Sequence, residues 1–378
     1  MPSLAMVLVA AVVVFVLGAI GGNLVFKQYF HVPEPSDELH HVETEDGVEI
    51  GIYHHLPDDG PGDGEPVVLC HGLSVNHRDV DFDETRSVAK YLSEQGYDCW
   101  APDLRGRGAS EVPDESWSFD HYVEQDLPAV IDHVRETTGS DEVHWVGHSM
   151  GGMLYYVLAG GEAYGDAIAS GVTLGSPVQF RRHRGKFLYY LSIFGLFSRP
   201  VFGFPKRIWP HPLQTRWAAV FLPVIPHRIA LAVLNKRNVV TDTIRRAANH
   251  SMAMVSPRVV LNFADWVVHD RWKSEDHTVN YRRRVETVET PTRMISGSAD
   301  HLCPAPDVAA GYEEIPTDDK DYVEAGPEEG MEEGYGHVDL VFGERAPDEI
   351  FPLIAEWLED HPIDGRSDGE DRTSDGDG

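Results

Sequence analysis

The sequence predicts an α/β fold built on a mostly parallel sheet, and three observations lead to that prediction. Short apolar runs alternate with helical patterns at the spacing of right-handed βαβ units. The run at 66–70 is wholly apolar, which is typical of a strand that is buried on both faces of a sheet. The third observation is a short run at 143–146 that is followed by Gly147-x-Ser149-x-Gly151 and then by a helical pattern. This is the arrangement of a sharp strand-to-helix turn.

The first half of the chain supplies most of the alternating elements. Asp46-Gly47 is a hairpin turn signal, Ser118 is a candidate helix N-cap, and Gly96 and Gly139 stand just beyond helical patterns. The expected elements are a hairpin over 40–55, a strand at 66–70, a helix at 83–95, a strand at 97–101, a helix at 118–138, the strand at 143–146 with its following helix, and a strand at 167–174.

The alternation stops between residues 180 and 290. This segment is rich in Phe, Tyr and Trp, and over 181–290 it carries 19 Lys and Arg against 7 Asp and Glu, a net charge of +12. Since the whole chain has a formal charge of −31, the remainder carries −43. Such a contrast indicates a separate unit inserted between two strands.

After the insertion the strand-then-loop pattern resumes at 292–300. The expected elements are a short last strand at 321–324, a loop at 335–337 and an amphipathic helix at 350–358. The final stretch is rich in Asp, Gly and Ser, a composition that predicts disorder.

The composition excludes some classes of function. A formal charge of −31 disfavours nucleic-acid binding, because a phosphate backbone would be repelled. Three cysteines are too few and too odd in number for a disulfide framework. No metal or cofactor motif is found, since the histidines lack a His-x-x-x-His pair with further ligands nearby, so the expectation is no metal and no cofactor.

Residues 4–26 are uncharged and almost wholly apolar. A helix of that length rises about 35 Å, enough to cross a ~30 Å hydrocarbon core. A cleaved signal peptide is the alternative, but it would need a basic start and a clear cleavage site before Lys27. The expectation is a single-pass membrane protein of uncertain sidedness. Gly18-xxx-Gly22 is a candidate surface for pairing in a homodimer, with an incidental spacing of the glycines as the favoured alternative.

The chemistry centres on Ser149, which the two flanking glycines allow to sit in a strained turn at a helix N-terminus. A serine hydroxyl needs a base to take its proton, and the base needs an acid to fix its tautomer. Asp300 and His337 follow later strands in the order that this turn requires, so we expect them to be the acid and the base. Asp270 and Asp276, inside the insertion, are weaker rivals for the acid.

The negative oxygen that forms on attack needs two backbone N–H donors. We expect one from Met150, directly after the nucleophile, and the other from Leu73, in the loop after the strand at 66–70. His71 and His148 flank these two features and are candidates for substrate contacts, with loop ordering as the alternative for His71. Arg105 and Arg107 follow the strand at 97–101, where we expect them to order the loop; a substrate carboxylate is their alternative partner.

These residues together resemble the landmarks of the α/β-hydrolase superfamily. The shared motifs are His71-Gly72, Asp103-Leu104-Arg105-Gly106-Arg107-Gly108, Gly147-His148-Ser149-Met150-Gly151-Gly152, Gly297-Ser298-Ala299-Asp300 and Gly336-His337. The resemblance implies an α/β-hydrolase fold: a mostly parallel eight-stranded sheet, helices on both faces, and a large, mainly helical cap between strands 6 and 7. The cap is similar to those of the acid-lipase-like and polyhydroxyalkanoate-synthase-like branches. The latter uses a cysteine nucleophile, and dehalogenases and epoxide hydrolases use an aspartate, so Ser149 departs from all three.

The resemblance and the composition divide the chain into five parts. They are an anchor at 1–26, a first core part at 27–178, a helical cap at 179–290, a second core part at 291–362 and an acidic disordered tail at 363–378.

The function that follows is hydrolysis of carboxylic esters through an acyl-enzyme on Ser149. Apolar stripes in the cap, interleaved with basic residues, suit a membrane surface and a lipid or other hydrophobic ester, although such stripes also form cores. An acyltransferase, a thioesterase or an amidase with the same triad is the alternative enzyme. A non-catalytic, membrane-anchored binding protein of the same fold is the alternative from another class.

Overall fold

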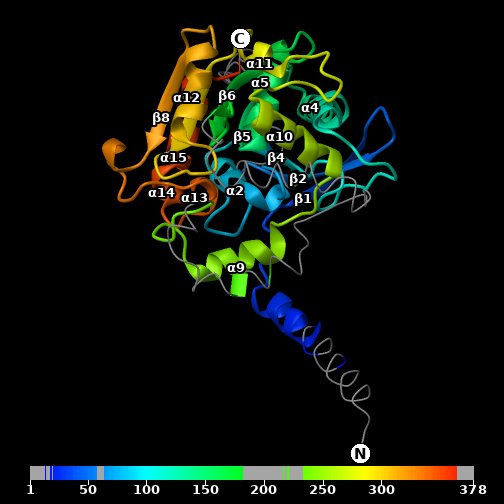
Figure 1. Cartoon of the computed structure of the whole chain (residues 1–378), viewed down its shortest axis with the longest axis vertical. Helices are drawn as coiled ribbons and strands as arrows, with labels where there is room; N and C mark the ends of the chain where they lie inside the picture. Colours follow the sequence, from blue (N-terminus) through cyan, green and yellow to red (C-terminus); the bar gives the residue numbers. More distant parts are fainter. Residues whose placement is uncertain are drawn as a thin grey trace, which may run out of the picture.

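A sheet of parallel strands with an antiparallel edge runs through the centre of the molecule (Figure 1). The computed structural model describes residues 20–57, 64–181 and 233–363, together with residues 13, 18, 216, 219 and 220. Within these residues eight strands form one sheet in the order β1-β2-β4-β3-β5-β6-β7-β8. The strands are β1 (Glu38–Glu43), β2 (Glu49–His55), β3 (Pro66–Cys70), β4 (Asp98–Pro102), β5 (Val143–His148), β6 (Ile168–Leu174), β7 (Thr292–Gly297) and β8 (Lys320–Ala325).

Helices cover both faces of this sheet, and each face has its own apolar core. One core joins the sheet to α4 and α5, and the other joins it to α2 and α15. The described helices are α2 (Val88–Ser93), α3 (Phe119–His121), α4 (Leu127–Thr138), α5 (Met150–Ala159), α9 (Thr241–His250), α10 (Pro257–His269), α11 (Tyr281–Val285), α12 (Ala305–Glu314), α13 (Asp339–Phe342), α14 (Ala346–Glu349) and α15 (Phe351–Asp360). The short 3₁₀ turns are His77–Asp79, Gly165–Ala167 and Pro327–Glu329.

The pairing of the strands confirms the predicted α/β-hydrolase fold. Strand β3 pairs in parallel with β4 on one side and β5 on the other, and β6, β7 and β8 follow β5 in parallel. At the other edge, β1 pairs with β2, and β2 with β4, in antiparallel fashion. The hairpin turns where Asp46-Gly47 predicts it, with Gly47 at φ 79° and its N–H donating to the carbonyl of Thr44 at 2.9 Å. All residues of β3 and β5 are buried, as expected for strands covered on both faces.

Two predicted helices differ from the structure. The helix expected at 83–95 begins only after Ser87, because the carboxylate of Asp83 accepts from the N–H groups of Thr85 and Arg86 and holds them in a turn. The helix expected at 118–138 contains a π-helical stretch, Tyr122–Asp126, between α3 and α4. Single π-turns of this kind have no clear signature in hydrophobic periodicity.

Buried charges order the loops that follow β3 and β4. Asp126, at the end of the π-helical stretch, accepts from the backbone N–H and the Nε of Arg105 at 2.9 and 2.6 Å. Arg107 donates to the carbonyls of Gly72 and Val75 at 2.9 and 3.0 Å. Both arginine side chains are almost fully buried, so they hold the loops together as expected.

The predicted membrane anchor is not found among the residues that the structure describes. Within the part of the chain that the structure describes, no helix combines the length and the apolar character needed to cross a bilayer. The predicted single-pass membrane localisation is therefore wrong. Residues 1–12, 14–17 and 19 lie outside the described residues.

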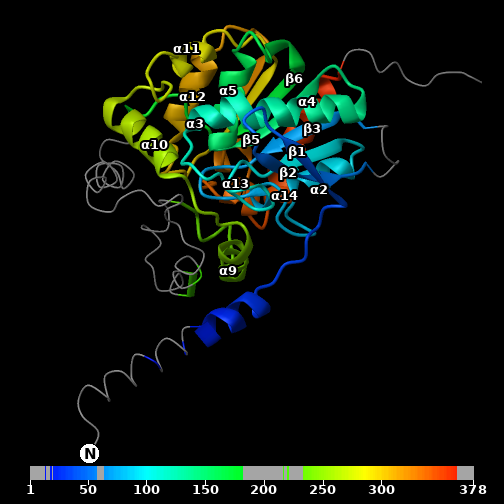
Figure 2. The same ribbon diagram turned by 90° about the vertical axis from the view of Figure 1, so that its right-hand side faces the viewer.

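The helical run at 20–29 packs instead against the insertion. The side chains of Phe26 and Phe30 form a small apolar cluster with Ala248 of α9. Nδ2 of Asn249 donates to the carbonyl of Phe30 at 3.0 Å. Figures 1 and 2 both show α9 between this amino-terminal helix and the sheet.

The predicted division into parts is only partly covered by the described residues. Residues 182–215, most of 217–232 and residues 364–378 lie outside them, including the aromatic stripes of the expected cap and nearly all of the expected acidic tail. The boundaries of the cap and the pairing of two copies through Gly18 and Gly22 stay predictions.

Candidate active site

Ser149 stands at a sharp turn between β5 and α5, and its backbone is strained. Its φ of 54° and ψ of −112° lie outside the regions that L-residues ordinarily adopt. Glycines make the turn possible: a Cβ added at Gly147 would lie 2.5 Å from the backbone of Gly151, and one added at Gly151 would lie 2.0 Å from the carbonyl oxygen of Cys70. The close approach of α5 to β3 and β5 therefore requires both glycines.

This crowding predicts that Gly151→Ala lowers the free energy of unfolding by about 3 kcal/mol, because the added methyl group would overlap rigid backbone. Urea denaturation measures the loss. Gly21→Ala is the matched control, since an added Cβ there has no heavy atom within 4 Å and alanine favours the helix in which Gly21 lies, so stability should not fall. Equal midpoints for the two variants would show that the turn tolerates a side chain.

Ser149, His337 and Asp300 lie together at the carboxyl ends of β5, β8 and β7. Ser149 Oγ lies 2.9 Å from His337 Nε2, and His337 Nδ1 lies 2.8 Å from Asp300 Oδ2. The other carboxylate oxygen of Asp300 accepts from the N–H groups of Leu302 and Cys303 at 2.7 and 2.8 Å. His337 and Asp300 are 4% and 3% exposed, so their hydrogen bond is shielded from water.

This geometry fixes the protons on the imidazole of His337. Since the Asp300 carboxylate can only accept, Nδ1 carries the proton and Nε2 is left to accept from the Ser149 hydroxyl. The arrangement can take a proton from the serine and stabilise the resulting positive charge. Burial raises the pKa of the thiols of Cys70, Cys99 and Cys303, so these cysteines are neutral and do not compete as nucleophiles.

The residues expected to supply the oxyanion donors lie beside Ser149. Met150 is the first residue of α5, where backbone N–H groups have no partner inside the helix. A Cβ added at Gly72 would lie 3.3 Å from the Cβ of Ser149, so the loop after β3 passes directly over the turn. The N–H of Gly72 donates to Asp79 at 2.7 Å, so this group is already engaged in a hydrogen bond. The roles of Leu73 and Met150 stay predictions.

His71 orders the loop after β3. Its ring is fully buried, Nε2 accepts from the N–H of Leu104 at 3.2 Å, and Nδ1 therefore carries the proton and donates to the carbonyl of Gly72 at 2.8 Å. Burial, followed by the charge of Arg107, lowers the pKa of His71 to about 4, so the ring is neutral. These contacts favour loop ordering, the alternative considered for this residue, over a substrate contact.

His148 forms a buried ion pair with Asp79, a partner that the sequence did not point to. Its Nδ1 donates to Asp79 Oδ2 at 2.8 Å, and its Nε2 donates to the carbonyl oxygen of His337 at 3.2 Å. Both ring nitrogens donate, so His148 is cationic. Burial alone would lower the pKa of His148, but the negative charge of Asp79 raises it.

The Asp79–His148 pair joins three parts of the candidate site. The carboxylate of Asp79 accepts from the N–H of Gly72. His148 directly precedes the nucleophile and donates to the carbonyl oxygen of His337. The contacts with His148 and Gly72 lower the pKa of Asp79 despite its burial. The pair should therefore stabilise the fold most between the ordinary pKa values of aspartate and histidine, and its contribution should be lost as the pH falls through the lowered pKa of Asp79 or rises through the raised pKa of His148.

Removing this pair should impair catalysis by displacing the site. We expect Asp79→Asn to lower kcat for an ester about 10²-fold, since a shift of about 1 Å in a catalytic geometry can have that effect. Steady-state kinetics across a range of pH gives kcat and KM separately. Asp81→Asn is the control, because Asp81 forms another buried pair, with His55 at 2.8 Å. If both variants lost kcat equally, the effect of Asp79→Asn would reflect only a general loss of buried structure, and Asp79 would have no specific role in positioning the site.

Described parts of the insertion contact both loops of the site. The N–H of Ala253 donates to the carbonyl of Ser74 at 2.9 Å in the loop after β3. On the other side, the N–H of Val338, next to His337, donates to the carbonyl of Val233 at 3.1 Å. The insertion thus contacts both the loop after β3 and the loop that carries His337.

Comparison with known proteins agrees with this architecture. A family model described as the alpha/beta hydrolase fold matches residues 65–195. Lipase 1 of Drosophila melanogaster is 33% identical over 182 residues, which cover 44% of this chain and 40% of that protein. The lysosomal acid lipase/cholesteryl ester hydrolase of Rattus norvegicus is 23% identical over 360 residues, which cover 84% of this chain and 87% of that protein.

Solved structures share the fold. A thermophilic esterase from Thermogutta terrifontis superposes with a TM-score of 0.58 at 17% identity, over 86% of this chain and 100% of that chain. At this identity the likeness concerns the fold alone, whereas the sequence matches point to lipases and agree with the acid-lipase-like resemblance. The chain therefore has the α/β-hydrolase fold and is similar in sequence to proteins named lipases, although its alignments with the first of these relatives cover only 34–40% of their length.

Proposed function

We propose that this chain is a serine hydrolase that cleaves carboxylic esters through an acyl-enzyme on Ser149. The observation that carries the proposal is the chain of two hydrogen bonds, 2.9 Å from Ser149 Oγ to His337 Nε2 and 2.8 Å from His337 Nδ1 to Asp300. The strained backbone of Ser149 supports the same role, because it presents the hydroxyl at the amino-terminal end of α5.

The reaction proceeds in two halves. Ser149 Oγ attacks the ester carbonyl while His337 Nε2 takes its proton, and His337 then gives that proton to the departing alcohol. Water repeats the sequence on the acyl-enzyme, and the carboxylic acid leaves. Asp300 keeps the imidazole in the reactive tautomer and stabilises its positive charge throughout.

The N–H groups of Met150 and Leu73 hold the oxyanion of each tetrahedral intermediate. Their positions at the start of α5 and in the loop over Ser149 support this role. The anchoring of Gly72 by Asp79 keeps the loop in place before the substrate arrives, so little reorganisation accompanies the reaction.

The substrate class follows from the relatives and the insertion. We propose that residues 179–290 form a cap over the acyl site and that the enzyme prefers esters with long, apolar acyl chains. Relatives named lipases support a lipid ester. The contacts of residues 233 and 253 with the two loops beside Ser149 support a cap that borders the acyl site.

A panel of p-nitrophenyl esters from acetate to palmitate tests both parts of this proposal. We expect kcat/KM to rise with chain length and activity to be lost in Ser149→Ala at every length. A serine-dependent activity that falls with chain length would refute the lipid preference and leave the ester hydrolase intact. Activity on no ester, or activity that persists without Ser149, would refute the mechanism.

A further inference from the structure

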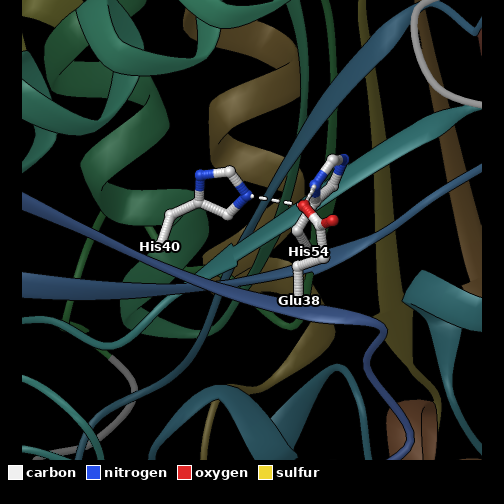
Figure 3. A group of neighbouring side chains, drawn as sticks. All are labelled: Glu38, His40 and His54. Atoms are coloured by element: carbon white, nitrogen blue, oxygen red, sulfur yellow. Dashed lines mark hydrogen bonds and ion pairs between the residues drawn. The ribbon is translucent and has the colours of Figure 1, made fainter.

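Three potential metal ligands meet at the antiparallel edge of the sheet, on β1 and β2. Figure 3 shows the rings of His40 and His54 turned toward the carboxylate of Glu38. Glu38 and His40 are two residues apart on β1, and Glu38 lies directly opposite His54 on β2. Because alternate residues of a strand share a face, the register places all three side chains on one face of the sheet.

The distances between the ligand atoms fit a single metal ion. Glu38 Oε2 lies 3.1 Å from His40 Nε2 and 3.6 Å from His54 Nδ1, and all three atoms lie within 4.8 Å of one another. A tetrahedral zinc ion with ligand bonds of about 2.0–2.1 Å separates its ligand atoms by about 3.3 Å. The two measured separations lie on either side of that value.

His54 supplies the strongest indication of a missing cation. Its side chain is 6% exposed, and its Nδ1 has no hydrogen-bond partner among the described residues. Its Nε2 lies 2.5 Å from Asp98 Oδ1, and the carboxylate fixes the proton on that nitrogen. Nδ1 faces the Glu38 carboxylate at 3.6 Å, and either a second ring proton or a metal ion bound to Nδ1 would stabilise this arrangement.

The surroundings resemble the outer shell of a metal site. A carboxylate on the far nitrogen of a ligating histidine fixes the ring and raises its basicity, as Asp98 does for His54. The ring of His54 also stacks on Trp100 at 3.6 Å between centroids. On the other side, His40 Nδ1 lies 3.4 Å from His133 Nε2, within hydrogen-bond distance.

We propose that Glu38, His40 and His54 form a binding site for a divalent transition-metal ion, with Zn²⁺ as the best match to two imidazoles and one carboxylate. Water completes the coordination, since the side chain of Glu38 is 53% exposed and leaves a path from solvent. The ion links β1 to β2 and, through Asp98, to β4. Its role is to fix the edge of the sheet, independently of the chemistry at Ser149.

The test uses the full chain after treatment with a chelator and exhaustive dialysis. Calorimetric titration with Zn²⁺ should show one site whose affinity falls at least tenfold in Glu38→Gln and in His40→Gln, and 10- to 100-fold in Asp98→Asn. His41→Gln is the matched control, because His41 is on the same strand but the opposite face, where it pairs with Glu49 at 3.1 Å. Its affinity should equal that of the unmodified chain.

Thermal unfolding gives an independent readout. Zn²⁺ should raise the Tm of the unmodified chain and of His41→Gln, because an ion that binds only the folded state stabilises it, and it should not raise the Tm of His40→Gln. Tetrahedral Co²⁺ absorption should follow the same pattern. The proposal is overturned if the unmodified chain binds no Zn²⁺, or if Glu38→Gln and His40→Gln bind it as tightly as the control.

Discussion

Ser149→Ala should lower kcat for ester hydrolysis by about 10⁴- to 10⁶-fold, which is the range found when a serine nucleophile is removed from a triad. The hydroxyl is the atom that forms the acyl-enzyme, and among the described residues its oxygen is the one that His337 Nε2 contacts. The substitution removes one oxygen and leaves the glycine contacts of the turn in place, so the fold should be kept. Initial rates on a p-nitrophenyl ester, with Tm measured in parallel, check both expectations.

Ser140→Ala is the control for this variant. Ser140 lies just before β5, at the end of the strand opposite to Ser149, where its hydroxyl donates to the carbonyl of Glu142 at 2.8 Å. Its activity should stay within about twofold of the unmodified chain. A variant at position 149 that keeps a substantial part of its activity would show that another group carries the acyl chain.

Asp300→Asn should lower kcat by about 10⁴-fold while leaving KM close to its original value. An amide in place of the carboxylate can donate to His337 Nδ1, which would move the ring proton to Nε2 and leave no acceptor for the Ser149 hydroxyl. The N–H groups of Leu302 and Cys303 that now bind Asp300 would still find a carbonyl oxygen. Steady-state kinetics measures kcat and KM separately.

Asp276→Asn is the control for Asp300→Asn. Asp276 was a rival candidate for the acid. Its carboxylate is exposed and accepts hydrogen bonds from the hydroxyl groups of Ser274 and Thr278, two residues away on either side. We expect its kcat to be unchanged. If Asp276→Asn lost activity and Asp300→Asn kept it, the acid of the triad would be Asp276, in the insertion, and not Asp300.

Much of the fold could be predicted from the sequence because its signals are local and steric. Gly147 and Gly151 are required by overlaps with nearby backbone, and the burial of β3 follows from its wholly apolar composition. The proximity of Ser149 to Asp300 and His337 could be expected for a related reason, since parallel strands bring their carboxyl ends to one edge of the sheet.

The features that were missed depend on tertiary contacts. Asp79 is far from His148 in the sequence, and only the turn after β3 brings its carboxylate to that ring. The apolar composition of the amino-terminal segment suggested a bilayer, but composition does not distinguish lipid from protein as the partner of Phe26 and Phe30. These aromatic rings pack on Ala248 of the insertion.

The cluster on β1 and β2 was missed for a different reason. A search for histidines at helical spacing overlooks Glu38-x-His40, which places two ligands on one face of a strand. The third ligand, His54, comes from the neighbouring strand, so its distance from Glu38 depends on the register of the hairpin. A Glu-x-His pair before a predicted hairpin is the signal that points to such a site.

Reaction with a fluorophosphonate is the most direct test of a nucleophilic Ser149. Intact-protein mass spectrometry should show one adduct per chain, peptide mapping should place it on Ser149, and denaturing the protein beforehand should abolish it. An unmodified chain that forms no adduct, or a Ser149→Ala variant that is labelled as fully as the parent, would contradict the catalytic assignment.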